Sequence, residues 1–439
     1  MTDSPAVQAP LDPKEQPILD SILAIRDNLC LLRQDKTRYI KSGDILSLYH
    51  QLIESVDALN DIRSEKRDEQ NRVDRVLDDC FQLVSLFFLT IGRNNEAPAQ
   101  YATTSTVKRL LDHLAEVQFY SAKDLESISG TLDNISEAIE RGKDKYSPQL
   151  VTLLEARLKT CRSLSKGLQD NLSILSPELA PVYEKLVSMI RSMAAANTKS
   201  KFPVVEVQGF QAQLKDIRES VADGKFAKEI VPSPIGREPI IDLIDRCLKW
   251  SEMVNEREGR VSEAFKPTYE KLQDIRNQLE KLSLTQAWSL RETDLYSYQR
   301  QLDRIDEARV NGNFIDDYGN VADLFHQRTM LYLLRRSYAY IYSLIIASEP
   351  VSEALLPVYN QLQTLRRCLL EVKKSGGVSS PRELYPYSMK LNSVDNMRVD
   401  GKFMVGSEIP EGQGSVNALL AECFEISHDL RVDADSDAE

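Results

Sequence analysis

The chain has 439 residues and a formal net charge of −12, and 28% of its residues are charged while 42% are hydrophobic. This length exceeds that of one ordinary domain, so the chain forms several domains or one long array of repeats. The negative charge argues against general affinity for nucleic acid or anionic membranes, because both attract basic surfaces. Glycine and proline are few, with 17 and 18 residues, and they cluster between periodic segments, which favours helices.

The sequence has no segment suited to secretion or to crossing a membrane. Residues 1–16 are polar and contain proline, without the apolar core of a signal peptide. The most apolar run, residues 331–347, carries Arg335 and Arg336 near its centre. It is also shorter than the roughly 20 residues that a membrane span needs. We therefore expect a soluble intracellular protein.

A proline-led helix recurs along the chain and predicts internal repeats. After an expected disordered lead at residues 1–11, Asp12 and Pro13 supply the acceptor side chain and the first-turn proline of a helix start. Apolar residues follow each repeat proline at +2, +5, +8 and +12, which lays one apolar stripe along a helix. Each proline lies in the first turn of its helix or kinks the helix slightly. The repeat prolines are Pro17, Pro181, Pro267 and Pro357, and a register without proline fits at Ser105.

A second helix follows in each unit and ends at a short glycine signature. The signature reads DGKF at residues 400–403 and 223–226, and NGNF at residues 311–314. We predict that its glycine closes the last helical turn in a left-handed conformation and that its aromatic residue folds back onto the core. In the first unit Arg63 takes the glycine position, and a charged helix is expected to continue through Asn71. The signature residues with these predicted structural roles are Gly224, Phe226, Gly312, Phe314, Gly401 and Phe403.

A third helix completes each unit, and one small residue, three positions after a leucine or isoleucine, marks its register. In chain order this residue is Cys80, Cys161, Cys247, Ser337 and Cys423. Because serine also fits the position, we interpret these cysteines as small buried residues where helices pack tightly, and we extend this to Cys30 and Cys368 on the first helices. No Cys-x-x-Cys or Cys-x-x-His pair, typical of zinc or redox sites, occurs.

The sequence therefore predicts an all-α protein of five tandem three-helix repeats that form an elongated helical array. The repeats are about 76–90 residues long. Periodicity leaves open whether they stack as a superhelix or run as end-to-end bundles. The predicted repeats are residues 12–96, 97–175, 176–261, 262–351 and 352–431, and an acidic disordered tail follows at 432–439.

Two of these patterns also resemble a known family. The stretches LPVYNQLQTLRR at residues 356–367 and DGKF at residues 400–403 are similar to those of an uncharacterised fungal protein family built on a repeated domain of unknown function. The resemblance extends over residues 17–430. Its motifs are structural, so it transfers no catalytic residue. It implies a protein of the cytoplasm and nucleus without assigned enzymatic chemistry.

Candidate chemistry is sparse in this sequence. None of the histidines, His50, His113, His326 and His428, lies within four residues of another histidine or a cysteine. A Cys–His or Ser–His pair assembled across repeats stays open, but no motif marks one, so we expect no catalytic residue, no metal and no cofactor. The Gly-Lys-Phe elements follow helices and lack a second glycine, so capping is favoured over phosphate binding.

Several arginines recur at equivalent positions and allow two interpretations. Arg26, Arg276 and Arg366 share the +9 position of first helices, and Arg309 and Arg398 share the last turn of second helices. In the first interpretation, these arginines donate hydrogen bonds to carbonyls at helix ends and interact favourably with the helix dipole. In the second, they form a ladder along one face that binds an acidic or phosphorylated partner. Two similar connections between second and third helices add the candidate partner contacts Ile230, Pro232, Ile409 and Pro410.

Taken together, these patterns predict a non-enzymatic scaffold or adaptor whose helical array presents a surface to protein partners. We expect no binding to nucleic acid or membrane, and a location in the cytoplasm and nucleus. The alternative is a binding module for an anionic ligand or phosphorylated peptide that uses the arginine ladder. An enzyme, such as a hydrolase with an unrecognised site, ranks third.

Overall fold

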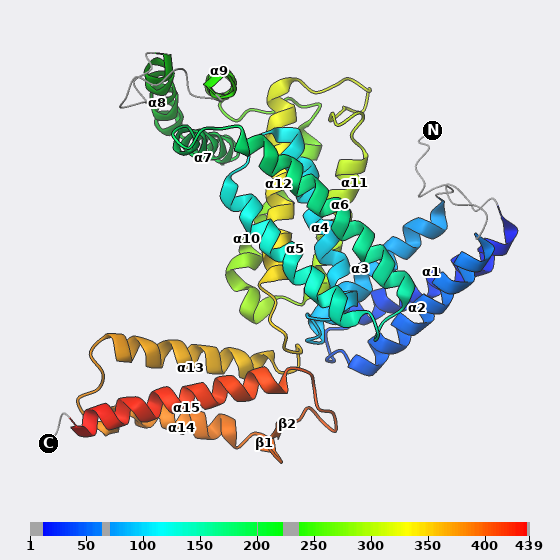
Figure 1. Cartoon of the computed structure of the whole chain (residues 1–439), viewed down its shortest axis with the longest axis vertical. Coiled ribbons are helices and arrows are strands. Elements are labelled where there is room, and N and C mark those ends of the chain that lie inside the picture. Colours follow the sequence, from blue (N-terminus) through cyan, green and yellow to red (C-terminus); the bar gives the residue numbers. More distant parts are fainter. Residues whose placement is uncertain (1–11, 64–70, 200, 223–236, 437–439) are drawn as a thin grey trace.

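The computed structural model of the chain describes residues 12–63, 71–199, 201–222 and 237–436 and is built almost entirely of helices (Figure 1). The predicted all-α array is confirmed. Successive helices pack in groups of three, which we call units 1 to 5. Unit 1 contains α1 (Gln16–Gln34), α2 (Ser42–Ile62) and α3 (Arg72–Thr90), and unit 2 contains α4 (Gln100–Val117), α5 (Ala122–Gly142) and α6 (Pro148–Ser173). Unit 3 contains α7 (Ala180–Asn197), α8 (Val204–Ala222) and α9 (Arg237–Arg257).

Unit 4 contains α10 (Lys266–Ser289), α11 (Leu295–Glu307) and α12 (Leu324–Ile346), and unit 5 contains α13 (Leu356–Lys374), α14 (Tyr385–Asp395) and α15 (Gln413–Ser436). Short 3-10 helices precede four of these helices, at Pro13–Glu15, Ala97–Ala99, Glu292–Asp294 and Pro381–Leu384. A small hairpin of β1 (Arg398–Val399) and β2 (Lys402–Phe403) follows α14. Among the described residues, none of the helices is both long and apolar enough to span a bilayer.

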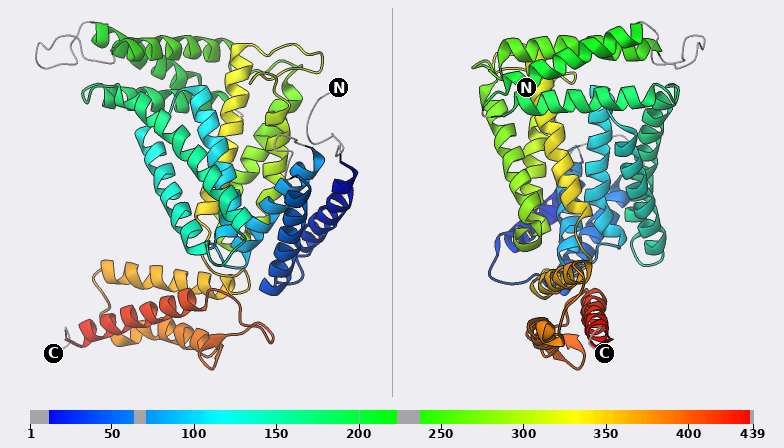
Figure 2. Two further views of the ribbon diagram at one scale, coloured as in Figure 1. Left: turned by 45° about the vertical axis from the view of Figure 1, so that its right-hand side comes forward. Right: turned by 90° about the vertical axis from the view of Figure 1, so that its left-hand side faces the viewer.

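The units do not simply stack in sequence order. Units 1, 2 and 4 share one hydrophobic core, whereas the cores of units 3 and 5 are separate. Helix α12 of unit 4 packs against both α10 and α4, which brings unit 4 back onto unit 2. Figure 2 shows unit 3 and unit 5 at opposite ends of this central block.

The apolar surfaces of two central helices explain this arrangement. Every residue of α3 from Phe81 to Thr90 is buried, and α12 is buried around most of its circumference. A helix that is apolar on all sides needs partners on more than one face. The neighbours in sequence cover only part of this surface, so α3 and α12 also pack against helices of other units.

The helix starts agree with the proline pattern. Pro17, Pro181 and Pro357 occupy the first turn of α1, α7 and α13, and Pro267 is the second residue of α10. A first-turn proline loses no intrahelical hydrogen bond, so the alternative of a kink is not needed. The Asp12 side chain accepts a hydrogen bond from the Lys14 N–H at 2.9 Å, as a helix-start acceptor should.

The predicted helix through Asn71 is wrong. Helix α2 ends at Ile62, and Asn71 is instead the N-cap of α3. Its side chain accepts a hydrogen bond from the Val73 N–H, while the Asp74 carboxylate accepts one from the Asn71 N–H. This reciprocal capping box starts a new helix.

The glycine signatures also differ from their predicted role as helix caps. Asp400 and Gly401 both have positive φ, 50° and 75°, and Val399 pairs antiparallel with Lys402 around them. Asn311 and Gly312, at φ 50° and 78°, form the same turn inside a Val310–Asn313 bridge. Two successive left-handed residues make a type I′ hairpin turn, for which Asp-Gly and Asn-Gly are the preferred pairs. Gly224 and Phe226 lie outside the described residues.

The aromatic part of the signature behaves as predicted. Phe314 and Phe403 are 4% and 3% exposed, so both side chains fold back into the core. A glutamine of the next helix holds each backbone in the same way. The Gln413 side chain accepts from the Phe403 N–H at 2.9 Å and donates to its carbonyl at 2.7 Å, and Gln327 does so for Phe314 at 3.0 and 3.1 Å.

Three of the register cysteines, Cys80, Cys161 and Cys423, lie against a backbone carbonyl of the first helix in their unit. Cys80 Sγ lies 3.5 Å from the Ile22 carbonyl, and Cys423 Sγ lies 3.5 Å from the Leu362 carbonyl. The predicted burial is confirmed for all members of the set, because none has exposed surface. This set is Cys80, Cys161, Cys247, Ser337 and Cys423.

The prediction that the cysteines of the first helices are also buried is wrong for Cys368. Its side chain is exposed, and Cys30 is only half-buried. Cys368 directly precedes the buried Leu369 of the apolar stripe, so it points away from the core.

Thiol reactivity should separate these cysteines. Burial raises the pKa of Cys161 and Cys423 to about 11 and that of Cys247 to about 12, and thiolate is the reactive form. In native protein, iodoacetamide should modify Cys368 fast and the buried cysteines only after unfolding. Peptide mapping at timed intervals measures this, and equal native rates at Cys368 and the register cysteines would contradict the packing.

Candidate functional site

A cleft lined by arginines lies where units 2, 3 and 4 meet. It encloses about 260 Å³, and α7, α9, α12 and the end of α4 contribute to its walls. Within the described lining, the basic residues outnumber the acidic ones, of which Glu116 is the only example. We define the arginine cleft by six of its side chains, Arg191, Arg246, Arg328, Arg335, Phe119 and Trp250.

The end of α4 brings Phe119 into this cleft. Gln118 follows α4 in a left-handed conformation with φ 59°, and its N–H donates to the Leu114 carbonyl. This arrangement closes the last helical turn and redirects the chain. Phe119 of unit 2 therefore joins the core of unit 3, where its ring becomes a wall of the cleft.

Arg328 is the most unusual charge of the cleft. Its guanidinium carbon lies 5.9 Å from the ring centroid of Phe119 and 5.7 Å from that of Trp250. These are cation–π distances. Among the described residues, no carboxylate lies within ion-pair distance of Arg328 and no hydrogen bond involves its side chain. Arg328 thus presents a half-buried positive charge between two aromatic rings.

Two further arginines of the cleft have carboxylate partners at its edge. Arg246 lies 3.2 Å from the exposed Asp242 and donates a hydrogen bond to Gln118 at 3.1 Å. Its guanidinium carbon is 5.4 Å from the Phe119 centroid, so Arg246 and Arg328 approach the same ring. Arg191 pairs with Asp124.

Arg335 resembles Arg328 in lacking a carboxylate. Its Nη1 donates to the Phe119 carbonyl at 3.3 Å, and no described carboxylate lies within ion-pair distance. Glu116 cannot neutralise the cleft, because it pairs with Arg309. After all described pairs are formed, the positive charges of Arg328 and Arg335 are left over.

The surroundings of these two arginines disfavour their charged form without removing it. Burial, followed by the neighbouring charge of Arg246, lowers the pKa of Arg328. Burial, followed by the charge of Arg191, lowers the pKa of Arg335 to about 10. Arg335 is therefore still protonated near neutral pH. An anion that enters the cleft would relieve this unfavourable burial of positive charge.

The cleft continues into a larger groove. A second hollow of about 710 Å³ shares Arg191, Tyr332 and Arg335 with the arginine cleft and runs between α12 and helices α4, α5 and α7. The cleft alone has room for a small group such as one side chain. Together with the groove, it can accommodate an extended segment of a partner chain.

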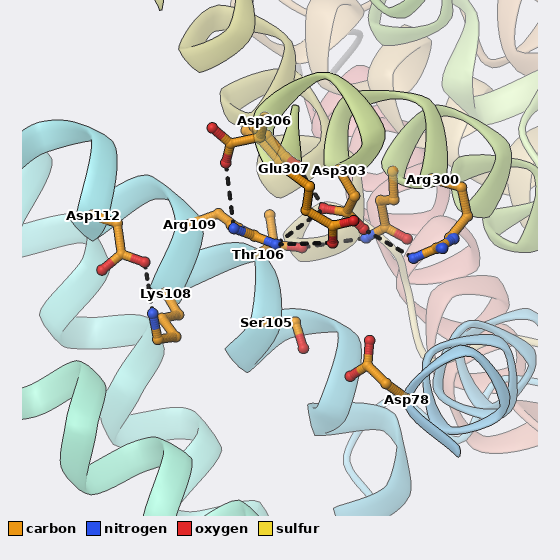
Figure 3. A network of polar contacts seen from close by, with 12 residues as sticks. Asp78, Ser105, Thr106, Lys108, Arg109, Asp112, Arg300, Asp303, Asp306 and Glu307 are labelled. Atoms are coloured by element: carbon orange, nitrogen blue, oxygen red, sulfur yellow. Dashed lines mark hydrogen bonds and ion pairs between the residues drawn. The ribbon is translucent and has the colours of Figure 1, made fainter. Parts of the chain in front are cut away.

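A second polar cavity, at the junction of units 1, 2 and 4, differs from the cleft because its charges are paired internally. It encloses about 440 Å³. Figure 3 shows Arg109 of α4 reaching toward the acidic side of α11, where its guanidinium lies 3.3 Å from Asp306 and 3.7 Å from Asp303. Arg300 lies 3.2 Å from Asp79 on α3. We conclude that this network of ion pairs holds units 1, 2 and 4 together and is not a ligand-binding site.

One carboxylate of this junction predicts a pH dependence of stability. Burial opposes ionisation of Asp306, but hydrogen bonds and charges of His113, Arg309 and Arg109 lower its pKa from 3.8 to about 2. A lowered folded-state pKa stabilises the fold above pH 4, and this contribution is lost as the pH falls toward 2. Asp306→Asn should therefore lose about 2 kcal/mol at pH 7.

Urea denaturation of wild type and Asp306→Asn from pH 7 down to pH 3 tests this expectation. The stability difference should shrink as the pH falls below 4, where wild-type Asp306 has less advantage over an unfolded carboxyl group. A difference that is absent at pH 7, or that grows below pH 4, would contradict the role given to Asp306.

The arginines predicted from the repeat pattern are not brought together. Arg26, Arg276 and Arg366 lie in units 1, 4 and 5, and each forms an ion pair within its own unit, with Asp27, Glu280 and Glu422. Arg309 and Arg398 pair with the aspartates three residues before them, Asp306 and Asp395. Four of the five arginines therefore pair within their own units, whereas Arg309 also pairs with Glu116 of unit 2, and the five do not form one ladder.

The other predicted contacts lie away from the cleft or outside the described chain. Ile409 is exposed and Pro410 half-buried in the connection before α15, while Ile230 and Pro232 lie outside the described residues. Within the described ranges, no group of three or more His, Cys, Asp or Glu side chains is placed to hold a metal ion.

Sequence reasoning missed the arginine cleft because its members have no common spacing. Arg191, Arg246 and Arg328 come from three helices and meet only in the folded chain. One signal was present, since Arg335 and Arg336 interrupt the most apolar run of the sequence. A charge at the centre of such a run is costly to bury and therefore marks a site worth attention.

Comparisons with known proteins confirm the family resemblance. The chain matches the model of a family described as a protein of unknown function, DUF2408, over residues 172–292 and 348–439. A protein of Schizosaccharomyces pombe named as a CUB1 family protein is 39% identical over 440 residues, covering 98% of this chain and 95% of its own. The Saccharomyces cerevisiae protein named "Cu(2+) suppressing and bleomycin sensitive protein 1" is 37% identical over 507 residues, covering 97% and 91%. No solved structure matches the chain.

Proposed function

The chain belongs to the CUB1 family of fungal proteins, and we propose that it acts as a non-enzymatic adaptor that binds an acidic segment of a protein partner in the arginine cleft. The single observation that carries this proposal is Arg328, a half-buried cation held between Phe119 and Trp250 without a carboxylate partner among the described residues. An unmatched charge of this kind lowers stability, so its presence is best explained by an anionic partner that supplies the missing charge.

The shape of the site favours a protein segment as that partner. The arginine cleft opens into the groove along α12, so a bound chain can place one acidic group near Arg328 and extend beyond it. Three units contribute walls to the cleft, which suits an array that presents surfaces rather than enclosed cavities. Arginine with aromatic side chains is also a frequent combination in protein interfaces.

The overall charge supports a protein partner over nucleic acid or membrane. At −12, the chain repels polyanionic surfaces over long distances, and the basic cleft is a local exception. A short acidic segment can enter this local positive field without meeting the rest of the surface. We place the protein in the cytoplasm and nucleus, where such partners are available.

Capture experiments with charge-matched variants test the proposal. Immobilised wild type, a cleft variant with Arg246→Ser and Arg328→Ser, and a control with Arg26→Ser and Arg366→Ser are incubated with fungal lysate. Both variants lose two positive charges, but the control loses them from surface ion pairs of units 1 and 5. Circular dichroism and melting curves confirm that all three proteins are folded.

We expect wild type and control to retain the same proteins and the cleft variant to lose a salt-sensitive subset. Cross-linked peptides of that subset should be acidic and should map to α9 and α12. Equal retention by the cleft variant, or losses shared with the control, would overturn the arginine cleft as the binding site.

A further inference from the structure

The arginine cleft carries two positive charges that no described carboxylate neutralises. This excess limits which chemical groups can serve as its ligand. Arg191 and Arg246 have carboxylate partners, and Glu116 is taken by Arg309. Arg328 and Arg335 have none among the described residues. A single carboxylate would neutralise only one of these two cations.

Geometry brings two guanidinium groups to one small region. The guanidinium carbons of Arg246 and Arg328 lie 5.4 and 5.9 Å from the centroid of the same Phe119 ring. Arg335 donates a hydrogen bond to the backbone carbonyl of this same residue, so a third cation also contacts Phe119. A compact group with several acceptor oxygens can contact more than one of these guanidinium groups at once.

A phosphate group matches both the charge and the geometry. A phosphorylated side chain carries about −1.5 to −2 charges near neutral pH and three strong acceptor oxygens. Resting on the proposed function, we infer that the acidic segment bound by the arginine cleft carries a phosphorylated residue, with its phosphate placed between Arg246, Arg328 and Arg335. The groove along α12 then holds the residues that flank it.

Binding of degenerate peptide pools tests this inference on the full-length protein. Fluorescein-labelled pools carry a central phosphoserine, phosphothreonine or phosphotyrosine, and matched pools carry glutamate or the unmodified residue. Fluorescence anisotropy gives the affinity of wild type, Arg328→Ala and the control Arg366→Ala. We expect at least one phosphorylated pool to bind about tenfold tighter than its glutamate counterpart.

Arg328→Ala should weaken the phosphorylated pool at least tenfold, and Arg366→Ala should leave it unchanged. The affinity for the phosphorylated pool should also fall from pH 7 to pH 5, because the second phosphate pKa is about 6. The affinity for the glutamate pool should change less, because glutamate and the arginines keep their charges over this range. Arg328→Lys should recover only part of the affinity, since lysine lacks the planar fork of donors.

Three outcomes would overturn the inferred phosphate preference. Each of them can be distinguished from a failure of the proposed adaptor function. If the glutamate and phosphorylated pools bind equally, the cleft binds acidic segments but does not prefer phosphate. Binding of inorganic phosphate or inositol hexakisphosphate as tightly as the peptides would assign the cleft to a free phosphate ligand. Absence of binding by every pool, combined with cleft-dependent capture from lysate, would retain the adaptor and reject the phosphorylated residue.

Discussion

Truncating Phe403 to alanine should destabilise unit 5 by about 3–5 kcal/mol, as expected when a buried phenylalanine is removed from a packed core. The Phe403 ring lies in the unit 5 core, and Gln413 holds its backbone N–H and carbonyl. Lys402→Ala is the matched control. Its exposed side chain points away from that core, so its removal should have little effect.

Cys423 offers a local readout of this prediction, because it belongs to the same core as Phe403. A loss of 3 kcal/mol should accelerate its labelling by a thiol reagent about a hundredfold, since opening of unit 5 becomes more frequent. Labelling of Cys80 in unit 1 provides the internal reference. Equal Cys423 rates in Phe403→Ala and Lys402→Ala would show that Phe403 does not anchor the hairpin.

Replacing Arg291 with methionine should lower the free energy of unfolding by about 3–5 kcal/mol, because it removes one partner of a buried ion pair. Arg291 Nε lies 2.6 Å from Glu353 Oε2, and its Nη2 lies 3.1 Å from Oε1. The two side chains are 10% and 9% exposed. Glu353 also accepts a hydrogen bond from the Ile40 N–H, so one carboxylate connects the start of unit 5 to units 1 and 4.

A surface ion pair between units 1 and 4 provides the control. Lys36 lies 2.6 Å from Asp294, but both side chains are well exposed. Lys36→Met should therefore cost less than about 1 kcal/mol. Adding Glu353→Gln to Arg291→Met should restore part of the stability, because the buried charge disappears with its partner. Urea denaturation followed by circular dichroism compares the variants, and equal costs for Arg291→Met and Lys36→Met would contradict the burial argument.

The helices and their buried faces could be predicted because apolar periodicity is a local signal. The hairpins could not be distinguished from helix caps by the same means. A left-handed glycine serves both structures, and the choice depends on where the helix stops. Helix α14 ends at Asp395, five residues before Asp400, so Gly401 is too far away to close its last turn.

The arrangement of the units was less accessible to sequence reasoning. The apolar circumference of α12 indicates that it needs several partners, but not that α4 is one of them. The arginine cleft depends on this arrangement, because Arg246 and Arg328 approach Phe119 only when units 2, 3 and 4 meet. Identical residues at repeated positions predicted an arginine ladder, whereas the unneutralised cations occur at positions without a repeat.

The most direct test of the arginine cleft uses the fluorescence of Trp250. The chain has two tryptophans, and the variant Trp288→Phe leaves Trp250 as the sole emitter. Because Arg328 lies over the Trp250 ring, an anion that draws the guanidinium away should change the emission. Titration with a peptide pool rich in aspartate and glutamate should give a saturable change that weakens with added salt and disappears in Arg328→Ala. A flat titration, or the same curve after Arg328→Ala, would contradict binding of an acidic segment in the arginine cleft.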